Sequence, residues 1–149
     1  MNADASAGAI WLAGFTGDPG SAFVRWQRGE LARIPSGRGW LVAEAPLMHS
    51  IRAMGRLSPS GKLGPVLGHA EADRAWWLLP LDAEHHLAHL AGQLTVHTPG
   101  WPLPCPSPDR YAHGRGWLEK PEGNGTLTAP AALRSALGNV GALPAEAGG

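Results

Sequence analysis

The spacing of apolar and polar residues predicts a series of short helices and strands joined by turns. Leu47, Ile51 and Met54 recur at helical spacing. We therefore expect a helix over residues 46–57 with these three side chains on its buried face. Residues 75–79 are apolar without alternation, which is typical of a strand buried on both faces of a sheet.

Turn residues and helix caps predict the other elements. We expect further strands over residues 31–34, 40–45, 64–68, 74–79, 93–97 and 116–119, and an extended segment over 101–108. We expect further helices over residues 7–14, 22–28, 83–90 and 129–137. Ile10, Trp11 and Phe15 are expected on the buried side of the first helix, and Asp82 and Thr128 as caps of the last two. Short strands with helices between them predict an α+β fold with a mixed or antiparallel sheet and flanking helices.

Length and composition indicate one small domain. The chain has 149 residues, 44% of them hydrophobic, with 21 glycines and 14 prolines. A chain of this size supports a single core, which we place at residues 7–142, with disordered ends at 1–6 and 143–149. Its one cysteine, Cys105, excludes an internal disulfide and a cysteine-based zinc site. We see no signal peptide and no membrane span, and expect a cytoplasmic protein.

Charge is unevenly distributed although the formal net charge is zero. Between residues 24 and 62, seven basic residues stand against two acidic ones. This stretch could form a basic face that meets phosphates, joined by Arg74 and by Trp101 as a stacking ring. The nucleic-acid-binding candidates are therefore Arg25, Arg28, Arg33, Arg38, Arg52, Arg56, Lys62, Arg74 and Trp101. The alternative is an ordinary solvated surface.

A pair of histidines at helical spacing provides a second candidate site. His85 and His89 would share one face of the helix expected over 83–90, a spacing that lets two imidazoles bind one metal ion. The third ligand stays open, with four candidates: Asp82, His97, Cys105 and His113. The alternative is an exposed amphipathic helix.

The order of short motifs along the chain resembles the bifunctional DNA primase/polymerase (prim-pol) domain, in particular the short actinobacterial proteins of this kind. The motifs that carry the resemblance are Ile10-Trp-Leu-Ala13, Trp26, Ile34-Pro-Ser-Gly37, Trp40 to Pro46, Gly64-Pro-Val66, Trp76 to Pro80, Gly100 to Ser107 and Trp117 to Pro121. Each motif is weak alone, and their order along nearly the whole chain carries the similarity.

The resemblance also implies which chemistry to look for. Active members, which are similar to archaeal-eukaryotic primases, hold divalent metal with an Asp-x-Asp pair on an early strand, a later Asp, and a His on the aromatic strand. In this chain the early pair falls on Glu44 and Pro46, the aromatic strand 74–79 has no His, and His69 lies just upstream. Residues 94–97 contain no acid. Glu44 is therefore the only catalytic acid that we expect to be retained. Because one carboxylate cannot hold two magnesium ions, we expect no nucleotidyl transfer.

These observations predict a degenerate primase/polymerase-like domain, a pseudoenzyme that acts as a nucleic-acid-binding, nucleotide-binding or accessory module. We expect no cofactor; Mg²⁺ or Mn²⁺ would be needed only if nucleotidyl transfer were retained. Two other classes stay open. One is a small metal-dependent enzyme that uses His85 and His89. The other is a protein-interaction domain, which an exposed patch of Trp side chains would favour.

Overall fold

The computed structural model describes residues 6–61, 63–90 and 92–138. Its helices are α1 (Ala7–Ala13), α2 (Pro19–Gln27), α3 (Leu47–Leu57), α4 (Ala83–Leu87), the 3₁₀ turns Ser58–Ser60 and Ala88–Leu90, and a last helix over residues 130–138. Its strands are β1 (Ala32–Pro35), β2 (Leu41–Pro46), β3 (Val66–His69), β4 (Arg74–Leu79), β5 (Thr95–Val96), β6 (Pro102–Cys105) and β7 (Arg115–Glu119). The α+β prediction is confirmed.

The main sheet has five antiparallel strands in the order β5-β2-β4-β3-β7. Along the chain, β2, α3, β3, β4, α4 and β5 follow the β-α-β-β-α-β order of a ferredoxin-like unit. β7 extends this unit at the β3 edge. A second sheet consists of β1 and β6, which pair across about seventy residues of chain.

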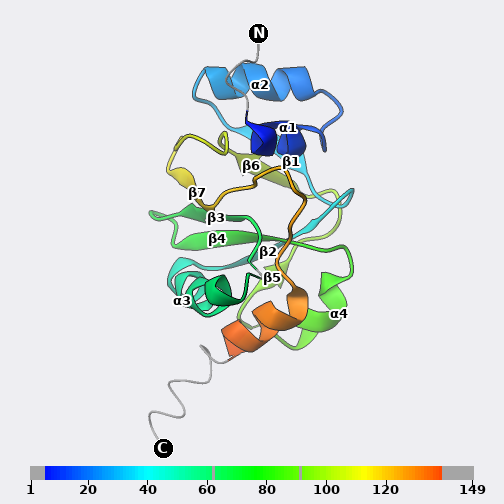
Figure 1. Cartoon of the computed structure of the whole chain (residues 1–149), viewed down its shortest axis with the longest axis vertical. Coiled ribbons are helices and arrows are strands. Elements are labelled where there is room, and N and C mark those ends of the chain that lie inside the picture. Colours follow the sequence, from blue (N-terminus) through cyan, green and yellow to red (C-terminus); the bar gives the residue numbers. More distant parts are fainter. Residues whose placement is uncertain (1–5, 62, 91, 139–149) are drawn as a thin grey trace, which may run out of the picture.

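The main sheet is covered on both faces. One face packs on α3, α4 and the helix over residues 130–138, and the other packs on α1, α2 and the β1–β6 pair. Figure 1 shows these two groups of elements on opposite sides of the sheet. Because successive strand residues point to opposite faces, Trp77 enters the first core and Trp76 the second. The prediction that residues 75–79 are buried on both faces is confirmed.

Two close contacts fasten α3 and the C-terminal segment to the sheet. The indole N–H of the buried Trp77 donates to the hydroxyl of Ser50 on α3 at 3.0 Å. The N–H of Gly64 donates to the hydroxyl of Thr128 at 2.9 Å. A Cβ at Gly64 would lie 2.6 Å from Cα of Leu127, so only glycine lets the two segments come this close.

Several predicted details of the helices are wrong. Ile10 is 59% exposed, because α1 instead buries Gly8, Ala9, Leu12 and Ala13, while Trp11 and Phe15 pack partly buried against the same core. Ile51 is 43% exposed, since the buried face of α3 consists of Ser50, Ala53 and Leu57. The helix predicted over 83–90 changes to 3₁₀ geometry after Leu87.

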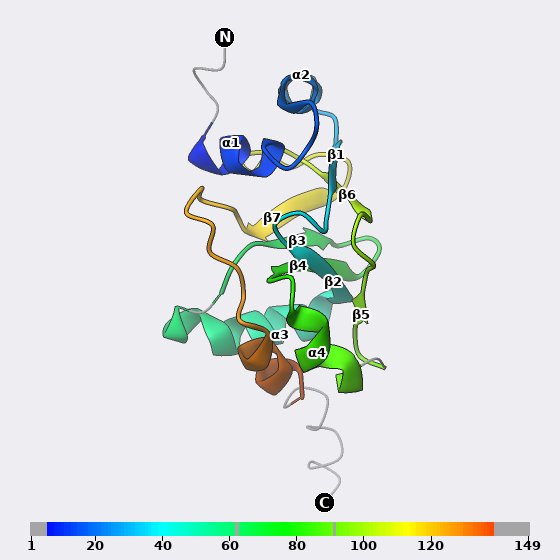
Figure 2. The same cartoon turned by 90° about the vertical axis from the view of Figure 1, so that its right-hand side faces the viewer.

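The two strands predicted around the turn at residues 35–39 exist, but they belong to different sheets. β1 pairs with β6 and β2 pairs with β4 and β5. Figure 2 shows β1 alongside β6 on the α2 side of the main sheet. The chain between them therefore connects two layers.

Among the described residues, no helix is long and apolar enough to cross a membrane. The disordered ends that we predicted at residues 1–6 and 143–149 lie, apart from Ser6, outside the described residues.

Candidate functional site

Glu44 lies on the α2 side of the main sheet, where three side chains bind its carboxylate. The indole N–H of Trp76, its cross-strand neighbour, donates to Oε1 at 3.0 Å. Nε2 of His97 lies 2.8 Å from the same oxygen, and Nε of Arg74 lies 3.4 Å from Oε2. The Glu44 side chain is 24% exposed, so the carboxylate is held by protein groups while solvent still reaches part of the side chain.

Aromatic and cationic groups surround this carboxylate. The guanidinium of Arg115 lies over the Trp76 ring, 4.2 Å from its centroid, and NH1 donates to the carbonyl of Pro104 at 3.0 Å. Burial lowers the pKa of Arg115, while Cys105 and Glu44 act to raise it. Since arginine titrates far above neutral pH, Arg115 stays a cation. His97 stacks on Trp101 with ring centroids 3.8 Å apart and planes within 4°.

Strand register places a row of three basic side chains beside Glu44. Arg74 on β4 pairs with His69 on β3, and His69 pairs with Arg115 on β7. Because residues two apart on a strand share a face, this row lies next to Glu44 and Trp76 on the same face. Nδ1 of His69 accepts from the N–H of Ala72 at 3.1 Å, so the neutral ring carries its proton on Nε2. All three side chains are therefore hydrogen-bond donors.

We call these seven residues the Glu44 site: Glu44, His69, Arg74, Trp76, His97, Trp101 and Arg115. It combines one carboxylate, already bonded, with two guanidinium groups and two ring systems that reach the surface in part. Arg74, 47% exposed, uses only Nε in its ion pair with Glu44, which leaves its terminal nitrogens for an acceptor. This chemistry suits a phosphate with an attached ring.

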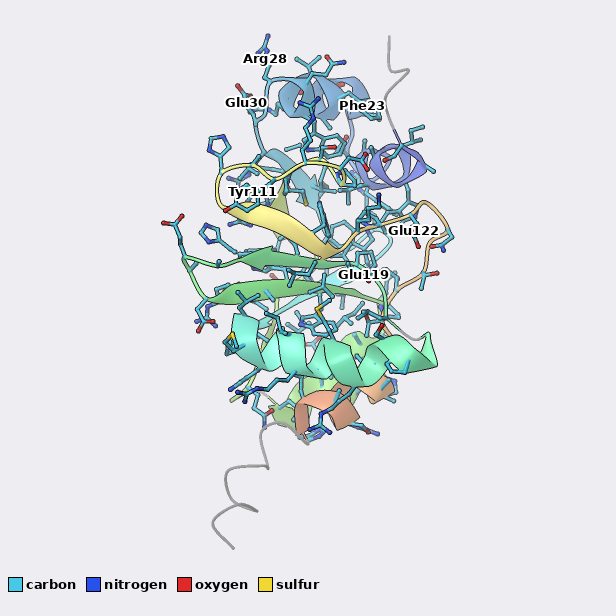
Figure 3. The ribbon with its side chains drawn as sticks, turned by 60° about the vertical axis from the view of Figure 1, so that its left-hand side comes forward. Phe23, Arg28, Glu30, Tyr111, Glu119 and Glu122 are labelled. Carbon is cyan, nitrogen blue, oxygen red and sulfur yellow. The ribbon has the colours of Figure 1, made fainter. Side chains whose placement is uncertain are left out.

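The predicted basic stretch is divided by the fold. Arg25, Arg28, Arg33 and Arg38 are exposed on α2, on β1 and in the turn after it, while Arg52 and Arg56 are exposed on α3. The main sheet lies between α2 and α3, and Figure 3 shows Arg28 and Glu30 at the α2 end of the molecule. The six described residues therefore form no continuous face, which corrects that expectation. Lys62 lies outside the described residues.

Two of the predicted nucleic-acid-binding residues do lie together. Both belong to the Glu44 site. Arg74 forms an ion pair with Glu44, and Trp101 stacks on His97, which contacts Glu44. Arg25 has a different partner, the carboxylate of Glu30 at 3.5 Å.

The two histidines of the predicted metal site are exposed at the far end of the molecule, in α4 and the 3₁₀ turn after it. The change of helix geometry alters the i, i+4 alignment on which the prediction of a shared metal depended. Of the proposed third ligands, His97 binds Glu44 and Cys105 is buried in the other core. Within the described ranges, no three His, Cys, Asp or Glu residues are arranged to hold a metal ion.

Cys105 is a structural residue in this fold. Burial raises the pKa of its thiol far above the usual range, and the charge of Arg115 only partly opposes this. The thiol donates to the carbonyl of Leu103 at 3.3 Å, and the carbonyl of Cys105 accepts from the Trp26 indole at 2.9 Å. A neutral, buried thiol is a poor nucleophile and a poor metal ligand.

The tryptophans do not form an exposed patch. Four of them are buried, and Trp11, Trp101 and Trp117 are half-buried. The fold therefore lacks the exposed patch of Trp side chains that would favour a protein-interaction domain. Trp26 and Trp40 are buried and cannot stack on bases.

Sequence reasoning missed Arg115 and assigned His97 only to a metal. The signal for Arg115 was its spacing two residues before Trp117, which places both on one face of a strand. Nothing in the sequence specifies that this strand pairs with β3 and brings Arg115 to His69.

None of the protein families, curated proteins or solved structures compared with this chain matches it.

Proposed function

We propose that this chain is a degenerate primase/polymerase-like domain that binds single-stranded nucleic acid at the Glu44 site and does not transfer nucleotides. The observation that carries the proposal is the cross-strand row of Arg74, His69 and Arg115 beside a carboxylate that protein donors already occupy. Guanidinium groups bind phosphate oxygens in pairs, and an imidazole N–H adds a further donor.

The surroundings of Glu44 argue against metal-dependent catalysis. Nucleotidyl transfer requires divalent ions held by several carboxylates. Oε1 of Glu44 instead faces Trp76 and His97, and Oε2 faces Arg74. The two cross-strand rows of the site contain no other acid. A carboxylate that is paired with Arg74 and hydrogen-bonded to Trp76 and His97 is poorly placed to bind a metal ion as well.

The ring systems support a single-stranded ligand. Bases stack on aromatic side chains when they are not paired, and this stacking is worth about 1–3 kcal/mol per base. Trp101, which stacks on His97, is half-buried, so part of its ring is open to solvent and is the surface on which we propose that a base stacks. Two to three cationic contacts to phosphates would give binding that weakens with salt with a slope of about −1.4 to −2 in logarithmic units.

Binding of a labelled oligothymidylate, followed by fluorescence anisotropy at several salt concentrations, tests the proposal. Arg74→Ala should weaken binding about five- to tenfold, because it removes a charge-assisted contact. Arg52→Ala is the matched control, since Arg52 is an exposed arginine on the other side of the sheet. It should change affinity less than twofold.

Two results would contradict the proposal. Equal effects of the two substitutions would show that the protein binds through its general charge and not at the Glu44 site. Template-dependent synthesis by the purified protein with Mg²⁺ or Mn²⁺ would show that catalysis is retained.

A further inference from the structure

A cleft of about 640 Å³ opens beside α2 and β1. On one side it is lined by α2, with its N-cap Asp18, Ser21 and Arg25 of the last turn, and on the other side by Arg33 and Pro35 of β1 and Pro104 of β6. No residue of the Glu44 site lines it.

β1, which lines this cleft, has an unpaired strand edge. Within the described residues β1 pairs with β6 alone. The N–H of Ser36 donates to the carbonyl of Trp101 at 3.0 Å, which sets the alternation of bonded and non-bonded positions along the pair. Arg33 and Pro35 then occupy positions where the backbone does not bond to β6. Their partners there are Pro104 and Pro102, which have no N–H to donate.

The outer edge of β1 offers three backbone groups to a further strand. The N–H and C=O of Arg33 and the C=O of Pro35 are directed away from β6. Donor and acceptor groups that alternate along an edge match the backbone of another extended chain. A phosphate has only acceptors, so the two carbonyls would oppose it. The edge favours a peptide over a nucleic acid.

The side chains of the cleft indicate the charge of that peptide. Arg33 is exposed and makes no ion pair among the described residues. Arg25 is 56% exposed and is paired with Glu30 at 3.5 Å, an exposed contact that another carboxylate can replace at little cost. Oδ1 of Asp18 is already bonded to the N–H of Ser21 at 3.1 Å. Asp18 keeps its negative charge at the start of α2, so an acidic side chain on the added strand would be attracted to the two guanidinium groups of Arg25 and Arg33 and not to that end of the cleft.

We propose that this cleft binds an extended acidic peptide of a partner protein as a third strand of the β1–β6 sheet. The backbone of Arg33 supplies the central pair of hydrogen bonds, and the side chains of Arg25 and Arg33 select an acidic residue. No residue of the Glu44 site lines this cleft, so the protein would connect a partner to a bound nucleic acid.

Titration of the full-length ¹⁵N-labelled protein with a capped peptide of alternating valine and glutamate tests this inference. The amide of Arg33 should shift and become protected from hydrogen exchange. Arg33→Ala, which keeps the backbone N–H, should weaken binding about three- to fivefold. Arg33→Pro, which removes the N–H as well, should weaken it by about a further tenfold, equivalent to about 1.4 kcal/mol.

The comparison between the two substitutions is interpretable because the N–H of Arg33 takes no part in the pairing with β6. Prolines already stand at the matching positions of β6. A peptide that is N-methylated at alternate residues makes the same comparison on the unmodified protein, should Arg33→Pro fail to fold. When the methyl groups are on the residues whose N–H would bond to Arg33, this peptide should bind about tenfold more weakly than the unmethylated peptide.

The inference is overturned if the peptide does not bind, if both N-methylated registers bind as well as the parent peptide, or if oligothymidylate protects the Arg33 amide and displaces the peptide. Arg74→Ala should leave peptide affinity unchanged, so failure of this inference can be told apart from failure of the nucleic-acid proposal.

Discussion

Glu44→Gln is predicted to strengthen the binding of oligothymidylate. The substitution keeps an oxygen that can accept from the Trp76 indole, and it removes the negative charge that lies 3.4 Å from Nε of Arg74. A phosphate bound by Arg74 would lie on the order of 7 Å from this carboxylate. At that distance two unit charges repel by about 0.6 kcal/mol in bulk water and by about 2.4 kcal/mol at an effective dielectric constant of 20.

The lower part of this range applies because Arg74 is 47% exposed. We therefore expect affinity to rise about three- to fivefold at low salt, and the gain to shrink as salt increases. Fluorescence anisotropy measures it, with Glu84→Gln as the control. Glu84 is an exposed acid on α4, and its substitution changes the net charge equally.

The sign of this effect separates the two possible roles of Glu44. If Glu44 held a metal ion for a bound nucleotide, Glu44→Gln would lower the affinity for the nucleotide or the activity. A loss of affinity for Glu44→Gln comparable with that of Arg74→Ala would refute the reasoning. So would an equal gain for Glu84→Gln.

Three further predictions concern the packing of the fold. Ser50→Ala, which removes the acceptor of the buried Trp77 indole, should lower the free energy of unfolding by about 1–3 kcal/mol in urea titrations. Gly64→Ala should destabilise by about 1–3 kcal/mol, because its methyl group would meet the backbone of residues 127–128, while Gly55→Ala, exposed on α3 with open space around it, should stabilise by about 0.5–1 kcal/mol. Cys105 should not react with a thiol reagent in the native protein; because burial raises the pKa of its thiol, stability should fall as the pH rises above about 8.5, where the unfolded chain ionises, and Cys105→Ala should remove that fall. A pH-independent difference between these two proteins would show that the thiol ionises equally in both states.

The local pattern of the sequence predicts many of the elements but not their neighbours. The strand at 74–79 and the helix after Pro46 are close to the predicted bounds, since hydrophobic spacing and helix caps act over a few residues. The pairing of β1 with β6 depends on residues far apart in the chain, and no local signal specifies it. The same holds for the row of Arg74, His69 and Arg115, which only the register of three strands brings together.

The divided basic stretch has a related cause. Residues 24–62 are close along the chain, but β2, which belongs to the main sheet, separates α2 from α3 in the sequence, and the two helices lie on opposite faces of that sheet. Charge counted along a sequence therefore overestimates the charge on one surface. The helix faces were mispredicted because α1 and α3 bury mainly small residues, which allow close packing but contribute little to an apolar pattern.

The indole N–H signals of the seven tryptophans, recorded by NMR while oligothymidylate is added at low salt, test the central claim most directly. We predict shifts for Trp76, whose N–H binds Glu44, and for Trp101, and no shift for Trp77, which lies in the opposite core. A spectrum in which Trp76 and Trp101 stay unchanged as ligand binds would contradict a nucleic-acid site around Glu44.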